Sequence, residues 1–311
     1  MPRLLDLPAA ELAARLAPRY PSAEEPLPIV LDTDTANEID DQFALTYARL
    51  APSLALEAVY AAPFRGDEVG PAEGMARSYE EIVRVLDRLG LAERPPVLRG
   101  SSSYLPAEDT PVESPAARDL VARALAPRAE PLRVVAIGAI TNVASAILLE
   151  PRIADRIVVV WLGGEPWYWE GPQSIAFNLY QDVPAARVIF DSGVPLVHVP
   201  CSNVSEHLRT TLPELARYVR GRGAVGDYLY GLFEDHYPDH FARSKEIWDV
   251  AAIAYCLNPD WTPSALRPSP ILRDDLSWAP TDPTRHLIRE VLTVRRDAVF
   301  GELFQLLAER A

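Results

Sequence analysis

Short, continuous apolar runs alternate with helical stretches along this chain, and this alternation constrains the fold more than any other feature. Six runs read as strands: Pro28–Leu31, Leu56–Ala61, Val97–Arg99, Arg133–Ile137, Ile157–Leu162 and Leu196–Val199. Helical patterns lie between them, at Asp40–Leu50, Gly74–Leu89, Pro115–Ala126, Asn142–Leu149 and Val183–Asp191. Runs without polar alternation are typical of strands covered on both faces. The order predicts an α/β fold with an open, mostly parallel sheet flanked by helices.

The rest of the chain adds helices and no visible boundary. Three later segments have helical patterns: Leu212–Arg220, Val225–Glu234 and Ile247–Leu257. Met1–Ser22 has scattered apolar residues among charges and prolines, which predicts a short amphipathic helix and no signal peptide. The 30 prolines are spread over the connections, and no repeat or low-complexity tract occurs. We expect one domain over residues 1–311, with residues 1–26 as an N-terminal extension, in a cytoplasmic protein.

The charge balance limits the class of ligand. The chain has 44 acidic and 30 basic residues and a formal net charge of −14. A long polyanion is repelled by such a chain unless a basic patch exists, and no basic run is present, so we expect no nucleic acid polymer as partner. No apolar run approaches the ~18 residues of a membrane span, so we expect no membrane partner. Two cysteines cannot form a disulfide framework, and we assign neither a role.

An acidic cluster follows the first predicted strand. Four aspartates lie within ten residues: Asp32, Asp34, Asp40 and Asp41. Crowded carboxylates repel one another, which is relieved by raised pKa values, by solvent or by a bound metal ion. The carboxyl ends of parallel strands share one edge of the sheet, where ligands bind. We expect Gly138–Asn142 and Gly163-Gly164, which follow the fourth and fifth strands, at the same edge.

Four interpretations of this cluster compete. In the simplest, Asp40 and Asp41 stabilise a helix start and the other two aspartates are solvated. An EF-hand loop requires glycine where the chain has Asn37. An aspartyl-phosphate phosphatase requires Thr or Val at Ala36 and a catalytic lysine, and Lys245 is the only lysine. The fourth interpretation is a site for a hard cation, because carboxylate oxygens select calcium or magnesium.

With this motif the chain resembles the inosine–uridine nucleoside hydrolase family, whose members carry Asp-x-Asp and then Asp-Asp after a first strand. The match runs from about Pro28 to the C-terminal helices and places the chain in a divergent branch. The resemblance implies an open α/β fold, one calcium ion (Ca2+) and hydrolysis of ribonucleosides to ribose and base, as in purine and pyrimidine salvage. We expect a homodimer or homotetramer.

The resemblance also implies residue roles. Asp34 would be a calcium ligand and the base that deprotonates the attacking water. The other calcium ligands would be Asp41, Asp249 and the main-chain carbonyl of Ile137. Groups that hold the ribose or support the cluster would be Asp40, Asn178 and Asp32. The Gly-x-x-Thr-Asn turn after Ile137 is by itself an ordinary N-cap for a helix.

The chain departs from the family pattern at several positions. A glutamate that binds the 5′-hydroxyl is replaced by Ala176, and a histidine that protonates the leaving base is replaced by Trp248, which has no proton to give. The loop Thr35–Ile39 is two residues longer, so that Asn37 and Glu38 are expected to reach the sugar or base. The usual ribose-binding Asn after the second strand is replaced within Ala61–Arg65.

Two groups of side chains remain without a fixed role. An aromatic-rich stretch with Trp161, Trp167, Tyr168 and Trp169 would form a lid over a planar leaving group, or else a surface or oligomer contact. Four histidines are considered as acids: His198, His207, His236 and His240. The main hypothesis is calcium-dependent hydrolysis of a ribonucleoside. The alternatives are hydrolysis of a modified nucleoside or other N-riboside, and a non-catalytic ribose or nucleoside-binding protein.

Overall fold

The computed structural model describes residues 4–173 and 176–310 and contains one large sheet. Its strands are β1 (Leu27–Thr33), β2 (Leu54–Ala61), β3 (Val97–Arg99), β4 (Leu132–Ala136), β5 (Ile157–Leu162), β6 (Leu196–Val199), β9 (Ser264–Pro268) and β10 (Leu287–Val291). Their order is β3-β2-β1-β4-β5-β6-β10-β9. Only the edge pair β9–β10 is antiparallel. The predicted open, mostly parallel sheet is confirmed.

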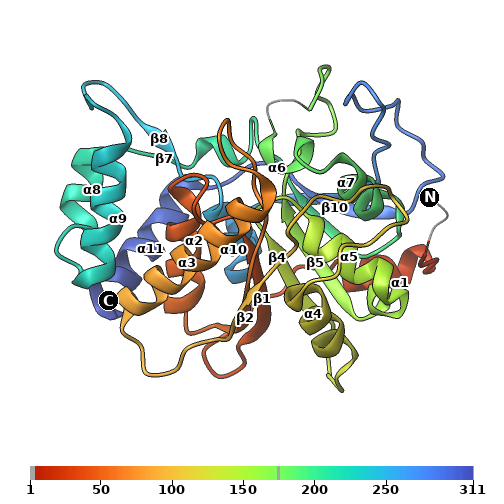
Figure 1. The fold of residues 1–311 in the computed structure, drawn as a ribbon, viewed down its shortest axis with the longest axis horizontal. Helices are drawn as coiled ribbons and strands as arrows, with labels where there is room; N and C mark the ends of the chain where they lie inside the picture. Colours follow the sequence, from red (N-terminus) through yellow and green to blue (C-terminus); the bar gives the residue numbers. More distant parts are fainter. Residues whose placement is uncertain (1–3, 174–175, 311) are drawn as a thin grey trace.

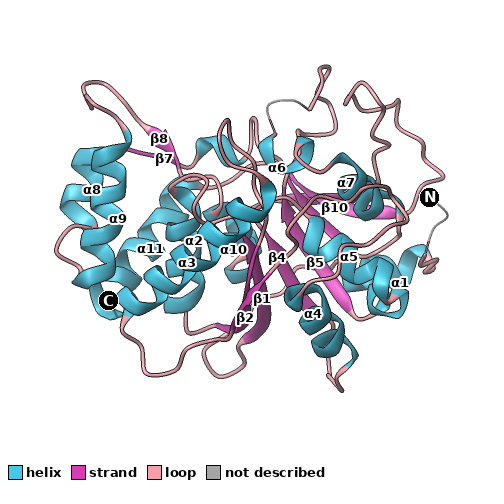
Figure 2. Cartoon of the chain, in the orientation of Figure 1, coloured by secondary structure: helices cyan, strands magenta, loops and turns pink. Residues whose placement is uncertain are grey.

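Helices cover both faces of this sheet, so the strands form a central layer (Figures 1 and 2). One apolar cluster joins one face to α1 (Ala9–Arg15), α2 (Asp40–Leu50), α3 (Pro71–Leu89), α8 (Leu212–Tyr218), α9 (Gly223–His236), α10 (Val250–Leu257) and α11 (Arg296–Arg310). A second cluster joins the other face to α4 (Pro115–Leu125), α5 (Thr141–Leu149) and α7 (Val183–Asp191). A short helix, α6 (Phe177–Tyr180), precedes α7.

The continuous apolar runs follow from this double covering. In β5, Val158 and Val160 belong to the first cluster, whereas the alternate residues Val159 and Trp161 belong to the second. Every position of such a strand faces a helical layer, so none is free to be polar. Polar residues are therefore displaced to the strand ends, where the connections begin.

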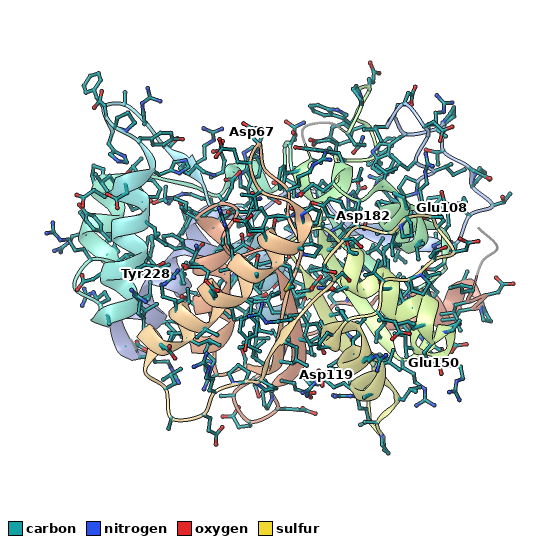
Figure 3. The ribbon with its side chains drawn as sticks, in the orientation of Figure 1. Asp67, Glu108, Asp119, Glu150, Asp182 and Tyr228 are labelled. Atoms are coloured by element: carbon teal, nitrogen blue, oxygen red, sulfur yellow. The ribbon has the colours of Figure 1, made fainter. Side chains whose placement is uncertain are left out.

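Polar side chains also tie the helices on one face together. Glu81 on α3 accepts hydrogen bonds from Tyr228 on α9 at 2.5 Å and from Gln42 on α2 at 3.3 Å. Figure 3 shows Tyr228 between α9 and α3. The link fixes α2, whose first turn carries two of the aspartates.

Several predicted boundaries differ from the structure. The opening helix is limited to α1, and residues 1–3 of the predicted segment Met1–Ser22 lie outside the described residues. The helix predicted for Ile247–Leu257 begins at Val250, because the N–H of Ile247 donates to the carbonyl of Leu208 (2.8 Å) and Asp249 is the N-cap. The sequence analysis did not predict β9, β10, α6 or α11, nor the two-stranded sheet of β7 (Arg209–Thr210) and β8 (Lys245–Glu246). Among the described residues, no helix is both long and apolar enough to cross a membrane.

Candidate active site

Strand β1 ends at the carboxyl edge of the sheet and places two of the aspartates there. Asp32 is the sixth residue of β1 and is fully buried, and Asp34, just beyond the strand, is 2% exposed. The chain then turns, with the N–H of Asn37 donating to the carbonyl of Asp34 at 2.8 Å, and enters α2 at Asp40. The single β1–α2 connection therefore carries both acidic pairs.

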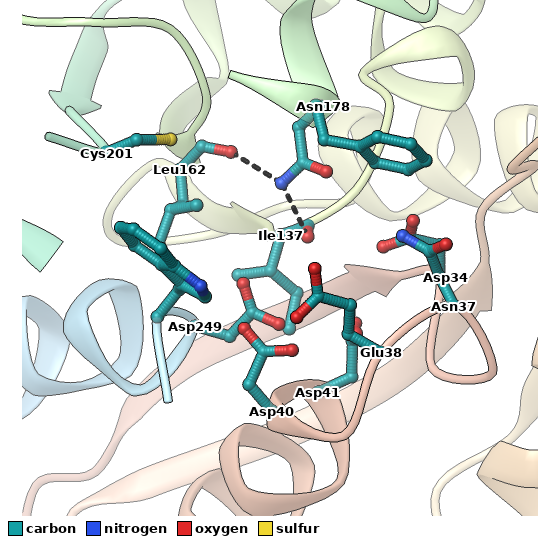
Figure 4. Close-up of a pocket in the computed structure, with 12 residues that line it drawn as sticks. Asp34, Asn37, Glu38, Asp40, Asp41, Ile137, Leu162, Asn178, Cys201 and Asp249 are labelled. Carbon is teal, nitrogen blue, oxygen red and sulfur yellow. Dashed lines mark hydrogen bonds between the residues drawn. The ribbon is translucent and has the colours of Figure 1, made fainter. Parts of the chain in front are cut away.

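Three of the carboxylates meet at one point. Asp40 and Asp41 lie in the first turn of α2, where free backbone N–H groups stabilise negative charge. Asp249 comes from the far end of the sequence, at the start of α10. Oxygen atoms of these three buried side chains lie within 4.8 Å of one another, and Figure 4 shows the three carboxylates close together. The Thr33 hydroxyl donates a hydrogen bond to Asp41.

This crowding disfavours ionisation. Burial, with the nearby charge of Glu38, raises the pKa of Asp40 to about 6. Burial and then the charge of Asp40 raise the pKa values of Asp41 and Asp249 well above the ordinary range. Burial and then the charge of Asp41 do the same for the pKa of Asp34. Carboxyl groups in this condition gain stability from a nearby positive ion.

Asp32 is fully buried and does not line the pocket. The amide nitrogen of Asn142 on α5 donates to Asp32 Oδ1 at 2.7 Å and to the carbonyl of Ala61 at 3.3 Å. The N–H of Ser101 donates to the amide oxygen of Asn142 at 2.7 Å. Burial raises the pKa of Asp32 to about 7, and the bond from Asn142 opposes this rise. Asn142 thus connects the ends of β1, β2 and β3.

The Thr-Asn turn has a different role from the N-cap that its sequence suggested. Helix α5 follows Ile140 and has no side-chain cap. The Thr141 hydroxyl donates to Asp182 Oδ2 at 2.6 Å, whereas Asn142 turns to Asp32. Asp182, labelled in Figure 3, also caps α7. Both side chains of the turn therefore connect elements instead of closing their own helix.

The end of β4 contacts Asp34 directly. A Cβ atom on Gly138 would lie 2.8 Å from Asp34 Oδ1, so this carboxylate requires a glycine beside it. Asp34 Oδ2 is buried without a hydrogen-bond partner among the described residues. The amide nitrogen of Asn178 donates to the carbonyls of Ile137 at 2.9 Å and Leu162 at 3.0 Å. The orphaned oxygen of Asp34 is an acceptor that a cation would satisfy.

These groups line one pocket, shown in Figure 4, with a cavity volume of about 110 Å³. Its lining is Asp34, Asn37, Glu38, Asp40, Asp41, Ile137, Leu162, Phe177, Asn178, Cys201, Trp248 and Asp249. Every predicted site residue except Asp32 therefore lies at the pocket. The lining combines carboxylates with apolar and aromatic side chains.

Three lining residues were given no role by the sequence analysis: Leu162, Phe177 and Cys201. Leu162 ends β5 and Cys201 lies two residues beyond β6, so the rule that ligands bind at the carboxyl ends of strands would have found both. Phe177 has no such signal. Burial raises the pKa of the Cys201 thiol, so this residue contributes a wall and no thiolate nucleophile.

The loop Thr35–Ile39 is tied to β8 by an ion pair between Glu38 and Lys245. Lys245 Nζ donates to Glu38 Oε2 at 2.6 Å and to the carbonyl of Glu246 at 3.0 Å. Lys245 is only 6% exposed. Its burial opposes its charge, but the charges of Asp40 and Glu38 raise its pKa above the ordinary value. Lys245 therefore stays protonated at the rim of an acidic site.

No histidine is among the described residues that line the pocket. His198 is fully buried, with Nε2 2.7 Å from the carbonyl of Gly163 and Nδ1 3.2 Å from Glu290. The residue that the family resemblance aligns with a proton donor, Trp248, does line the pocket. The aromatic wall is thus present without an imidazole beside it.

The lid predicted from the aromatic-rich stretch is wrong for one of its residues. Trp161 is fully buried in the second apolar cluster, with its ring centroid 5.6 Å from that of Phe190. Trp161 points into the core because of its place in the alternation of β5. Trp167 and Tyr168 are 44% and 46% exposed, and neither lines the pocket. Residues 174–175 of the stretch lie outside the described residues.

Comparisons with known proteins show the family of the chain. The model of the family described as inosine-uridine preferring nucleoside hydrolase matches residues 29–291. The non-specific ribonucleoside hydrolase RihC of Escherichia fergusonii is 28% identical over 264 residues, which are 75% of this chain and 80% of that protein. The pyrimidine-specific ribonucleoside hydrolase RihB of Escherichia coli is 30% identical over 135 residues, and that match spans only 42% of either chain.

A solved structure shows the same fold. The plant nucleoside hydrolase PpNRh1 superposes with a TM-score of 0.72 at 20% identity, covering 91% of this chain and 99% of that one. The chain thus has the architecture of an α/β enzyme, with an open sheet and a buried acidic pocket at the carboxyl ends of its strands. The chain belongs to the inosine-uridine preferring nucleoside hydrolase family. The members of this family are N-glycosyl hydrolases.

Proposed function

We propose that the chain hydrolyses the N-glycosidic bond of a ribonucleoside to ribose and free base, with a calcium ion held at the acidic cluster. The observation that carries the proposal is the juxtaposition of buried carboxylates with an aromatic wall in one pocket. A sugar is polar and a base is planar and less polar, so the two sides match the two parts of a nucleoside. Family membership supports the reaction class.

The donor set fits a hard cation. Asp40, Asp41 and Asp249 offer clustered carboxylate oxygens, and Asp34 Oδ2 is buried without a partner among the described residues. We propose Asp34, Asp41, Asp249 and the carbonyl of Ile137 as the ligands. Oxygen ligands alone favour calcium over zinc. When bound, the cation supplies positive charge that lowers the pKa of a water molecule and orients the diol of the sugar.

The protein groups then have separate roles. Asp34 accepts the proton of the attacking water, because it is the carboxylate of the pocket lining with a buried oxygen that has no partner among the described residues. Asp40 accepts hydrogen bonds from the ribose hydroxyls, and Asn178 and Asn37 hold the sugar from two sides of the pocket. Bond cleavage gives the sugar oxocarbenium character, which the surrounding carboxylates stabilise.

The leaving base is placed against the apolar side. Trp248 and Phe177 line it, and no histidine does so among the described residues. An indole does not donate a proton to a departing base, so stacking is its contribution. We therefore propose that planar bases which leave readily are the preferred substrates.

A second candidate is hydrolysis of a modified nucleoside or other N-riboside. It is favoured by Ala176, which is fully buried in the second apolar cluster and places no carboxylate at the sugar. A third candidate, binding of ribose or a nucleoside without turnover, is favoured by Trp248. The cytoplasmic location and the homodimer or homotetramer stay predictions from the sequence.

The test is release of ribose from a panel of nucleosides by purified protein, together with its metal content. We expect release from at least one common ribonucleoside and about one calcium per chain. Release only from a modified riboside would favour the second candidate, and binding without release the third. Zinc in place of calcium would contradict the ligand assignment.

A further inference from the structure

The loop Thr35–Ile39 brings a further acidic group to the pocket, the carboxylate of Glu38. This carboxylate is not part of the cluster formed by Asp40, Asp41 and Asp249. Glu38 lines the pocket, and its side chain is 46% exposed, in contrast to the buried aspartates. Figure 4 shows Glu38 pointing into the pocket beside Asp40. Its position at the rim is suited to a part of the ligand that faces the pocket entrance.

Lys245 fixes the direction of this side chain. A glutamate on an exposed loop samples several rotamers, and ordering it costs conformational entropy. The ion pair from Lys245 to Glu38 Oε2 at 2.6 Å restricts those rotamers. Lys245 is itself buried and anchored to the carbonyl of Glu246 on β8. The acceptor is therefore oriented before any ligand arrives.

The ion pair leaves one oxygen of Glu38 available. No hydrogen bond to Glu38 Oε1 is present among the described residues, and the ammonium group engages Oε2 only. A carboxylate with one oxygen paired to an ammonium group can still accept a hydrogen bond at its other oxygen from a neutral donor. Within the pocket, such a donor is a hydroxyl group of the ligand.

We propose that Glu38 binds the primary 5′-hydroxyl of the sugar, and that Lys245 is the positioning residue that holds Glu38 for this contact. The inference rests on the proposed function, in which the 2′- and 3′-hydroxyls are bound by the cation and Asp40. A ribofuranosyl group then has one free hydroxyl left, and Glu38 is the remaining carboxylate of the lining. The specificity of the site for an unmodified 5′ end follows from this contact.

The experiment compares inosine and uridine with their 5′-deoxy counterparts. We expect the wild type to prefer the hydroxyl-bearing substrate by about ten- to a hundredfold in kcat/KM, the range of a hydrogen bond to a charged group. Glu38→Ala should lose this preference and leave kcat/KM for the 5′-deoxy substrates within about threefold. Equal losses on both substrates would overturn the proposal, since they would indicate a loop-ordering role alone.

The matched control is Glu130→Ala. Glu130 is also a half-exposed glutamate paired with an arginine, Arg19, and it does not line the pocket. This variant should keep the preference of the wild type. A similar loss of preference in the control would assign the effect to general charge and contradict the role of Glu38.

Lys245→Met tests the positioning role. We expect it to reduce the preference for the 5′-hydroxyl in the wild-type background and to have no further effect on that preference in Glu38→Ala. The quantity compared is the ratio of kcat/KM for the 5′-hydroxyl substrate to kcat/KM for the 5′-deoxy substrate. If Lys245→Met lowered this ratio by the same factor in the wild type and in Glu38→Ala, the two residues would not be coupled and the positioning role would be refuted. If the wild type releases no ribose at all, the proposed function fails. In that case calorimetric titration measures the Kd of inosine and of 5′-deoxyinosine for the wild type and for Glu38→Ala. The proposal for Glu38 then requires that the wild type prefer inosine and that Glu38→Ala lose this preference.

Discussion

At the scale of single residues, the site depends on carboxyl groups that burial makes reluctant to ionise. Among the carboxylates that line the pocket, Asp34 is the one with a buried oxygen that has no partner among the described residues, and Gly138 lies close beside its other oxygen. A base needs an acceptor oxygen that no other group occupies and a fixed position, and Asp34 has both. The remaining carboxylates lie too close to one another to act independently.

We expect Asp34→Asn to abolish turnover while most sugar affinity is kept, because the amide cannot take a proton but still offers an oxygen to a cation. Steady-state kinetics with the best nucleoside substrate, and calorimetry with ribose, measure the two properties. A variant that retained more than about a tenth of the wild-type rate, a barrier change below ~1.4 kcal/mol, would place the base elsewhere.

Trp248 is expected to support leaving groups by stacking, which is worth about 1–3 kcal/mol per base. Trp248→Ala should therefore harm inosine and uridine hydrolysis far more than hydrolysis of p-nitrophenyl riboside, whose leaving group needs no protonation. The comparison uses kcat/KM for the three substrates, with Trp248→His as a second variant. Equal losses on all three would show that Trp248 shapes the start of α10 around Asp249 and takes no part in leaving-group departure.

At the scale of elements, Asn142 connects the carboxyl ends of three strands. We expect Asn142→Ala to lower the free energy of unfolding by about 2–3 kcal/mol, because it leaves Asp32 and two main-chain groups without their bonds. Chemical denaturation measures the loss. Ser145→Ala is the control, since Ser145 is buried on the same helix and accepts one bond, from the N–H of Val112 at 3.1 Å. A loss no larger than in this control would contradict the role of Asn142.

The sequence predicted those elements whose signal is local. The first six strands, β1 to β6, are short runs of mostly apolar residues, and all six were found to within two residues. In contrast, β10 reads Leu287-Ile288-Arg289-Glu290-Val291, with charged residues whose partners are distant in sequence, so no local pattern marks it as a sheet strand. Glu290 is 3.2 Å from His198 on β6, a contact that requires the tertiary fold.

The last helix is a different case, because its signal was present. The buried residues of α11 fall at Val299, Phe300, Leu303, Leu306 and Leu307, which is helical spacing.

The site residues also divide into those with a local sequence signal and those that depend on the tertiary fold. The Asp-x-Asp and Asp-Asp pattern located the acidic side, whereas Lys245 was noted in the sequence only as a missing phosphatase lysine. Its bond to Glu38 depends on loop geometry that spacing does not encode.

At the scale of the whole molecule, the acidic cluster couples stability to pH and to cations. The pKa of Asp32 is about 7 in the folded protein, against an ordinary value of 3.8, and the pKa values of Asp34, Asp41 and Asp249 are raised as well. The folded state then binds more protons than the unfolded state between pH 4 and 7. Its stability without cations therefore falls as pH rises through this window.

We expect protein treated with EDTA to lose more than about 1 kcal/mol of unfolding free energy between pH 5 and 7.5. Calcium at 100 times its Kd should restore about 3 kcal/mol at the higher pH. Because calcium displaces protons from the carboxyl groups, its apparent affinity should rise with pH. Differential scanning calorimetry at several pH values, with EDTA or calcium, measures both effects. Identical unfolding temperatures with and without calcium at every pH would contradict a cation at the cluster.

The separation of Asp249 from the other carboxylates along the chain has a consequence for biosynthesis. Asp40 and Asp41 leave the ribosome early, and Asp249 follows only after β1 to β6 have been made. Until then we expect Asp40 and Asp41 to remain hydrated and to need no counter-ion, so that the nascent chain does not bury an incomplete group of carboxylates. We therefore expect ion capture only after Asp249 has been made, when β9, β10 and α11 are still to follow. A chain ending before Asp249 should fail to retain calcium in equilibrium dialysis, whereas retention by that fragment would show that the early carboxylates suffice.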